Sequence, residues 1–439
     1  MIAEPGLEHE TFKTFIEKFR KETSHTDATS KMRQRAWDHF ITLGLPSKKM
    51  EAYRYIKLKQ LFSQFYQGSR LPEVDSQEIA SYILPESKRS FLVFVNGHYV
   101  PSLSNREAIP SNVVISTFQE ASQTYGTFLN NQWTRSLKEE QDSFAALNGA
   151  IHQNGLFLYV PPKCIVDVPV QIIHLTLGNN PWQMMTPRLQ ISVGAQSEIN
   201  FVMSQKDKGG QGYFVNHVTE ISLEEAARVH FTQIFCDLHP EGWYFDAFRA
   251  NLKRDSHLKT VCVTEGSATV RTDYRISLIG ENAEALLNGV CMLADKREAH
   301  SHIFMDHQAP NCRSYQLFKG VLNDFARSSF EGKIMVRQIA QKTEAFQLNN
   351  HLILNDHAHA DSKPNLEIFA DDVKASHGAT VGQLNADQLF YMKTRGFSDH
   401  EARNLLIYGF CEEVIEQIPV DSLKDEISLK AKNILRKRE

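Results

Sequence analysis

Four short segments of alternating apolar and polar residues recur along the middle of this chain. They begin at residues 189, 219, 248 and 274, an interval of about 28 residues, which is the range typical of repeat architectures. Each segment is expected to be a strand, because its side chains alternate with a period of two. A single strand of this kind cannot bury its own apolar face, so the repeated units must stack on one another. The spacing therefore predicts a repetitive β-architecture.

The simplest stack of such units is a parallel β-helix, in which Ile191, Ile221 and Ile276 occupy equivalent core positions. A β-sandwich with strands of similar length fits the same alternation, so the pattern by itself leaves both folds open. In either case we expect the β-core to span about residues 154–384. A connecting α/β segment, residues 91–153, precedes it.

The first 90 residues have helical rather than strand periodicity. Phe12, Phe15 and Phe19 recur at helical spacing, and Thr11 precedes them as a plausible N-cap. A second helix is expected to end at Gly44, a residue suited to helix termination. Residues 1–90 are therefore predicted to form an N-terminal helical domain.

Helical spacing returns at about residue 385 and continues to residue 439. Asn385 with Gln388, and Ser398 with Glu401, are both cap residues followed at the third position by Gln or Glu, which predicts two helix starts. Gly396 lies between them as a stop signal. This C-terminal helical domain could be mistaken for a helix-turn-helix DNA reader, but its helices show no basic recognition face.

Composition excludes several classes of function. The net charge is −4, from 48 basic and 52 acidic residues, so no electrostatic footprint for nucleic acid is present. Apolar runs such as Phe91–Val95 have the length of a strand and are too short to span a membrane. Met1–Glu10 lacks the apolar core of a signal peptide. Six scattered cysteines without a CxxC pair are expected to be reduced, which favours a cytoplasmic location and core-filling roles.

One group of side chains suggests an enzyme instead. His300, His302, Asp306 and His307 resemble a metal box, and residues i and i+2 of a strand share a face, so two imidazoles could bind one ion. Three residues separate His302 from Asp306, however, which is not the hydrolase spacing. A metal-dependent hydrolase and a polar turn of the β-core both remain open. A polysaccharide-active β-helix is a further alternative, but no groove of paired carboxylates is evident.

The sequence contains no motif typical of nucleotide binding or hydrolysis. No phosphate-binding loop, GxSxG elbow or GxGxxG fingerprint occurs at a strand-to-helix junction. We therefore expect the chain to hydrolyse no nucleotide itself.

The densest motif region runs from residue 318 to residue 382. It includes Phe330-Glu331-Gly332-Lys333, residues 364–374, and Ser376-His377-Gly378-Ala379-Thr380. This region resembles the SufB/SufD family of the SUF iron–sulfur cluster assembly system, in the form typical of its SufD branch. The resemblance implies a mainly β fold, a right-handed parallel β-helix between N-terminal and C-terminal helical domains. It also implies a non-catalytic scaffold subunit that assembles clusters with a SufB paralogue and the SufC ATPase.

The resemblance further implies where partners and metal bind. His377 corresponds to a histidine at the SufB interface that helps to bind a transient iron–sulfur cluster shared with SufB, with no permanently bound cofactor. Ala375 departs from the family, since many relatives have a cysteine there. The isolated chain could also form a homodimer. The SufC-binding residues implied on the C-terminal helices are Arg395, Gly396, Phe397, Ala402, Leu405, Leu406 and Phe410.

Overall fold

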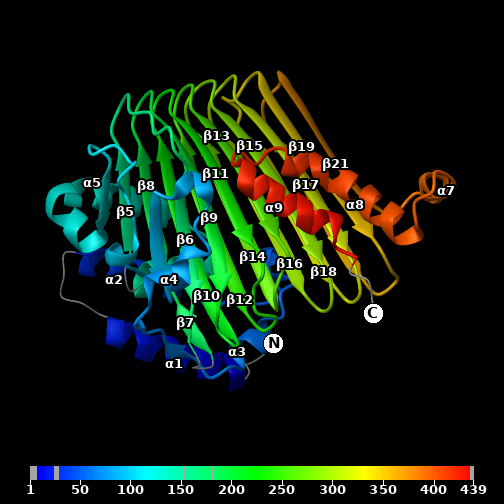
Figure 1. The fold of residues 1–439 in the computed structure, drawn as a ribbon. Coiled ribbons are helices and arrows are strands. Elements are labelled where there is room, and N and C mark those ends of the chain that lie inside the picture. Colours follow the sequence, from blue (N-terminus) through cyan, green and yellow to red (C-terminus); the bar gives the residue numbers. More distant parts are fainter. Residues whose placement is uncertain (1–6, 24–28, 153–154, 179–181, 436–439) are drawn as a thin grey trace, which may run out of the picture.

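The computed structural model describes residues 7–23, 29–152, 155–178 and 182–435. Within these ranges the chain is mainly β, and its centre is a parallel β-solenoid of about eight turns with helices at both ends (Figure 1). The fold predicted from the repeat is confirmed. The β-sandwich alternative is wrong, because consecutive repeats pair in parallel within one sheet instead of alternating in an antiparallel sandwich.

Two sheets form the walls of the solenoid, and each turn contributes one long strand to each sheet. The strands of sheet 1, in order along the solenoid, are β4 (Val114–Thr117), β5 (Gly155–Val160), β8 (Arg188–Val193), β10 (Tyr213–Leu223), β12 (Trp243–Leu252), β14 (Thr269–Leu278), β16 (Glu298–His307), β18 (Arg327–Val336) and β20 (His359–Ile368). In the same sheet, β7 (Gln183–Met185) pairs with β10, and β1 (Gln67–Gly68) pairs with β7. Those of sheet 2 are β3 (His98–Tyr99), β2 (Phe91–Val95), β6 (Val170–Thr176), β9 (Glu198–Asp207), β11 (Arg228–Phe235), β13 (His257–Thr264), β15 (Glu284–Leu293), β17 (Arg313–Leu322), β19 (Thr343–Ile353) and β21 (Val373–Gly382).

The four repeated segments stack in register on sheet 1. Ile221 pairs with Ile191 on one side and with Ala250 on the other, and Ala250 pairs with Ile276. All four side chains are buried between the two sheets. The predicted equivalence of Ile191, Ile221 and Ile276 is therefore confirmed, and the core is a column of apolar side chains along the solenoid axis.

A recurring left-handed residue sets the length of each turn at one corner. The residues with positive φ at this corner are Lys163, Gln196, Ala226, Asp255, Asn282, Asn311 and Lys342. The N–H of Ala226 donates to the carbonyl of Arg254 on the next turn at 2.9 Å, and the other six make the equivalent bond. Asn and Asp tolerate this conformation better than other non-glycine residues, and they occupy three of the seven positions.

The N-terminal helices lie mostly against sheet 1. They are α1 (Leu7–Thr23), α2 (Ser30–Leu43), α3 (Leu58–Phe62), α4 (Ser76–Ala80), α5 (Phe118–Glu139) and α6 (Ser143–Ile151), with 3-10 turns at Glu51–Tyr53, Pro85–Ser87 and Pro101–Leu103. The apolar side chains of α1, α2, α3 and α6 pack on Phe214, Trp243 and Phe245 of the sheet. Gly44 ends α2 as predicted, with φ of 71°. Thr11 lies inside α1 and is not its N-cap, so that prediction is wrong.

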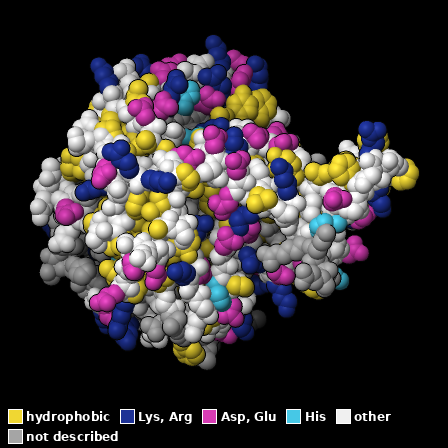
Figure 2. Space-filling view, viewed as in Figure 1, with side chains coloured by type: hydrophobic (Ala, Val, Ile, Leu, Met, Phe, Trp, Pro, Cys, Tyr) yellow, Lys and Arg dark blue, Asp and Glu magenta, His cyan; other side chains and the backbone are white. Residues whose placement is uncertain are grey.

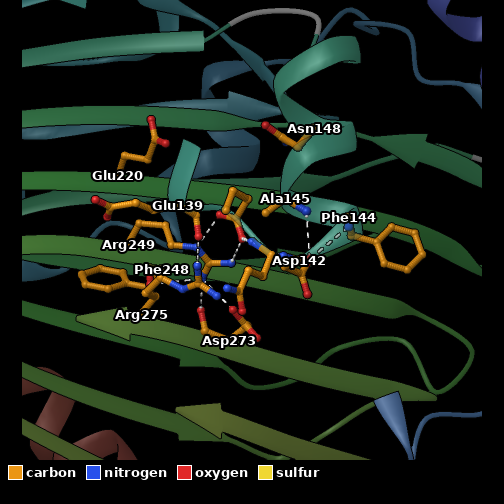
Figure 3. Close-up of polar contacts among 12 residues, drawn as sticks. Glu139, Asp142, Phe144, Ala145, Asn148, Glu220, Phe248, Arg249, Asp273 and Arg275 are labelled. Carbon is orange, nitrogen blue, oxygen red and sulfur yellow. Dashed lines mark hydrogen bonds and ion pairs between the residues drawn. The ribbon is translucent and has the colours of Figure 1, made fainter. Parts of the chain in front are cut away.

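A buried ionic cluster fixes the α5–α6 connection to sheet 1 (Figure 3). Arg249 binds both oxygens of Glu140, with Nε–Oε2 at 2.7 Å and Nη2–Oε1 at 3.1 Å, and its Nη1 lies 2.7 Å from Asp273. Arg271 joins Asp142 at 2.9 Å to Asp273 at 2.7 Å. All five side chains are buried. Asp142 also caps α6, because its carboxylate accepts hydrogen bonds from two backbone N–H groups of the first turn.

The C-terminal helices are α7 (Ala386–Thr394), α8 (Asp399–Ile415) and α9 (Asp421–Lys432). Both predicted caps are confirmed: Asn385 accepts from the first turn of α7, and Ser398 with Glu401 forms a capping box on α8. Helices α8 and α9 cover part of sheet 2, whereas α7 projects past the end of the solenoid (Figure 1). Among the described helices, none is long and apolar enough to cross a membrane.

Candidate functional site at the open end of the solenoid

The last turn of the solenoid leaves two long strands at its edge. In the described part of the chain, β20 pairs only with β18 and β21 only with β19, so one side of each strand has unpaired backbone groups. Every residue of β21 is partly or fully exposed. Such an edge is a template for pairing with another strand.

His377 lies in the middle of β21 and its side chain is exposed. It pairs with Gln347 of β19 and lies on the same side of the strand as Ala375, which packs against the core between the sheets. The glycine after His377 predicts from sequence that the histidine ends a strand, but this prediction is wrong, because β21 continues through Gly378 to Gly382. Instead, the imidazole is exposed because it belongs to the last turn that the structure describes.

The arm formed by α7 presents apolar side chains beyond the solenoid. Phe390 is 70% exposed and Tyr391 is 63% exposed, and no residue of α7 is buried. Phe397 and Leu405 continue the exposed apolar surface onto the following turn and α8. Figure 2 shows hydrophobic atoms along the projecting lobe that corresponds to α7 in Figure 1. Exposed aromatic side chains of this kind mark an interaction surface.

The partner-binding residues predicted from sequence differ in how far their side chains are exposed. Arg395, Gly396, Phe397 and Leu405 are exposed, and Leu406 is partly exposed. The expectation of an exposed side chain is wrong for Ala402, which is fully buried.

Phe410 is only partly accessible, because it packs against the cluster beneath α8 and lies 5.1 Å from the ammonium of Lys319. Sequence reasoning did not single out Phe390 and Tyr391. Two adjacent aromatic residues on a short helix were the available signal, since one helix face cannot bury both.

The four residues of the hydrolase alternative do not converge. Each has a different hydrogen-bonding partner: His300 contacts Ser329, His302 contacts Asp273, Asp306 contacts Arg337, and His307 contacts Ser314. His307 faces the interior, where burial lowers its pKa to about 4. Within the described ranges, no three or more His, Cys, Asp or Glu side chains are arranged to hold a metal ion. These residues act as polar members of the solenoid wall, and the hydrolase alternative gains no support.

Cys312, a thiol in the same half of the solenoid that could be considered as a metal ligand, is buried. Its Sγ donates to the carbonyl of Gly280 at 3.2 Å, and burial raises its pKa to about 11. A thiol with this pKa is protonated at neutral pH. It is therefore a poor metal ligand, because a metal ion must first displace the proton.

Comparison with known proteins gives matches along almost the whole chain. The family description "SUF system FeS cluster assembly, SufBD core domain" matches residues 175–410, and "SufBD protein N-terminal region" matches residues 9–172. An iron–sulfur cluster assembly SufBD family protein of Synechocystis is 30% identical over 90% of this chain and 88% of its own length. The iron–sulfur cluster assembly protein SufD of Escherichia coli is 28% identical over 90% of each chain. That of Bacillus subtilis is 25% identical over 66% of each chain.

Proposed function

Since the chain belongs to the SufBD family of the SUF iron–sulfur cluster assembly system, we propose that it is a non-catalytic scaffold subunit of a SufBCD-type complex. In this proposal a SufB paralogue pairs with the open end of the solenoid, and a SufC ATPase binds the C-terminal arm. The observation that carries the proposal is the combination, at one end of the fold, of an unpaired strand edge, an exposed histidine and an exposed apolar helix.

Strand addition is the form of pairing that the edge of β21 favours. Ser376 has a small side chain and Gly378 and Gly382 have none, so a second strand can approach without large side chains in the way. Main-chain hydrogen bonds then supply affinity along the strand. A SufB-type solenoid that ended in a similar edge would extend sheet 2 across the two subunits, and a second copy of this chain could do the same in isolation.

His377 is the proposed metal-binding residue of this interface. An imidazole is a borderline ligand that suits iron, but one imidazole cannot hold an iron–sulfur cluster, which needs several protein ligands. The other ligands must therefore come from the partner, and the cluster is a transient product instead of a resident cofactor. Ala375, two residues away on the same side, supplies no thiol.

ATP hydrolysis must come from a separate subunit, because the sequence contains no phosphate-binding loop. The arm of α7 and the start of α8 offer Phe390, Tyr391, Phe397 and Leu405 to such a subunit. Apolar side chains on a projecting helix suit insertion into a groove. We also propose a cytoplasmic location, supported by six free cysteines in the described part of the chain.

The cluster site is tested with His377→Ala. An exposed side chain costs within about 0.5 kcal/mol of stability when it is cut to alanine, so the variant should melt normally and still form the complex. It should accumulate no iron–sulfur chromophore during anaerobic assembly with the partner subunits. His359→Ala, an exposed histidine on β20, is the matched control and should assemble clusters at the parental rate. If His377→Ala also does so, His377 is not a ligand.

The ATPase site is tested separately with Phe390→Asp and Leu405→Asp. Both variants should remain folded, because both side chains are exposed, and both should lose binding to the ATPase in a pull-down. Leu429→Asp is the control, since Leu429 is 63% exposed but lies on α9. Equal binding by all three variants would show that the arm is not the docking site.

A further inference from the structure

One column of interior side chains on sheet 2 becomes polar toward the open end of the solenoid. Leu287 of β15 is followed in register by Gln316 of β17, Gln347 of β19 and His377 of β21. Ala345 lies in the core between the sheets, and Gln347, two residues later on the same strand, faces the same side. His377 is therefore the exposed last member of a polar column that is otherwise buried.

The two glutamines of this column form a side-chain ladder. Nε2 of Gln347 donates a hydrogen bond to Oε1 of Gln316 at 2.8 Å, and both residues are buried. The nitrogen and the oxygen of an amide point away from each other, so a nitrogen that faces the preceding turn leaves Oε1 directed toward the following turn. Stacked Gln side chains form ladders of this kind along successive strands. On the following turn, the residue in register with Gln347 is His377.

Gly332 of β18, on the facing sheet, restricts the position of the Gln347 amide. A Cβ at Gly332 would lie 2.8 Å from Cδ of Gln347 and closer still to its Nε2. The amide therefore lies directly against the backbone of Gly332, where no larger residue leaves room for it. Gln316 on one side and Gly332 on the other hold the amide of Gln347 in one place.

The amide oxygen of Gln347 is a buried acceptor without a donor. Oε1 makes no hydrogen bond in the described conformation, and an unsatisfied buried polar atom is costly and rare. Oδ1 of Asn349 is also without a partner, but the residue in register above it is Ala379, which has no side-chain donor. Above Gln347 lies an exposed imidazole that carries an N–H and is free to rotate.

We propose that Gln347 is a positioning residue for His377, an inference that rests on the proposed role of His377 in cluster binding. After a rotation of the exposed imidazole, its N–H donates to Oε1 of Gln347, and the other ring nitrogen keeps its lone pair for the metal. A histidine that binds a metal usually donates its second N–H to a fixed acceptor, which sets the tautomer and the orientation of the ring. The bond to Gln347 therefore decides which nitrogen of His377 binds iron.

The first experiment measures the tautomer of His377 in the free chain. The readout is ¹⁵N NMR of histidine-labelled protein at about pH 8.5, where an ordinary imidazole is neutral, and the His377 signals are those that His377→Ala lacks. Gln347→Met keeps the length of the side chain and removes the amide oxygen. It should shift the ratio of the two tautomers by about threefold or more, the change that one net hydrogen bond produces. Gln347→Glu keeps an acceptor oxygen and should retain the parental ratio.

The second experiment measures cluster formation in the complex with the partner subunits. Gln347→Met should form the iron–sulfur chromophore about 10- to 100-fold more slowly than the parent, the range typical for loss of a residue that orients a metal-binding histidine. Asn349→Leu is the matched control, because Asn349 is also a buried amide of β19 with an unpaired oxygen. It should keep both the parental tautomer ratio and the parental assembly rate.

An unchanged tautomer ratio in folded Gln347→Met would overturn the proposal, and so would a parental assembly rate or an equal effect of Asn349→Leu. If Gln347→Met does not fold, Gln316→Leu replaces it, since it removes the oxygen that holds the Gln347 amide and should shift the ratio in the same direction. Normal cluster assembly by His377→Ala would instead refute the role of His377 as a ligand. The tautomer ratio would still decide whether Gln347 orients the ring.

Discussion

Replacement of Arg249 by alanine should be among the most destabilising single changes in this protein. Arg249 is 6% exposed, and its guanidinium binds Glu140 through two nitrogens and contacts Asp273 through a third (Figure 3). Removing one partner of a buried ion pair costs about 3–5 kcal/mol, because the other charge remains buried and uncompensated. Asp273 keeps Arg271 as a partner, so most of the cost falls on Glu140.

The pH dependence of the free energy of unfolding provides a second test of this prediction. Burial raises the pKa of Glu140, but Arg249 outweighs that effect and the pKa lies below its ordinary value of 4.5. A lowered folded-state pKa contributes stability that is present above pH 4.5 and is lost as the pH falls through the folded-state pKa. Arg249→Ala lacks this contribution, so the stability difference between parent and variant should shrink as the pH falls below about 4.5.

The assay is urea unfolding followed by far-ultraviolet circular dichroism, at pH 7 and again at acidic pH. Arg254→Ala is the control, since Arg254 and Glu225 form an ion pair at 3.0 Å in which both side chains are more than half exposed. Loss of such a pair costs about 0–1 kcal/mol. If Arg249→Ala costs no more than Arg254→Ala at pH 7, the ionic cluster does not anchor the α5–α6 connection and the reasoning is refuted.

Three further measurements test the fold. Ile276→Asp should cost several kcal/mol in urea unfolding, because it buries an unpaired charge in the column between the sheets, and a parental unfolding curve would place Ile276 outside the core. His307 has a pKa of about 4 in the fold and an ordinary value of 6.5; the unfolded chain therefore binds the extra proton first, and stability should fall by up to about 3 kcal/mol as the pH drops from 6.5 to 4. His307→Gln should reduce that slope, and an unchanged slope would contradict the assignment. Ser398→Ala removes the capping box of α8 and should cost about 1 kcal/mol, which thermal unfolding would detect.

The solenoid could be predicted from the sequence because its information is local and repeated. A repeated segment such as residues 219–223 shows the strand period of its apolar side chains directly. In-register stacking follows once several such segments recur at one spacing. Helix caps such as Asn385 and Ser398 are equally local, since the side chain bonds to the next turn of its own chain. The prediction that Thr11 is the N-cap of α1 was wrong, because the same residue type also occurs in the interior of a helix.

The site was harder to predict, because its properties depend on long-range packing. Ala402 and Leu405 are both apolar residues of α8, but the first is buried and the second is exposed, and only packing against parts of the chain outside that helix decides this. His377 seemed to precede a turn because glycine follows it, yet the ladder with β19 extends the strand beyond that glycine. The hydroxyl of Ser328 contacts both Cys291 and His351, which come from non-adjacent turns, and no sequence spacing reveals these contacts.

The two ends of the solenoid differ in a way that bears on its partners. At the N-terminal end the sheets finish in short antiparallel strands, β3 with two residues and β4 with four, and short edge strands are a common protection against unwanted pairing. At the C-terminal end they finish in two ten-residue strands, β20 and β21. An edge of that length invites aggregation unless another chain covers it. Short strands close one end of the solenoid and two long strands edge the other, and this difference supports the proposal that a second solenoid pairs with the C-terminal end.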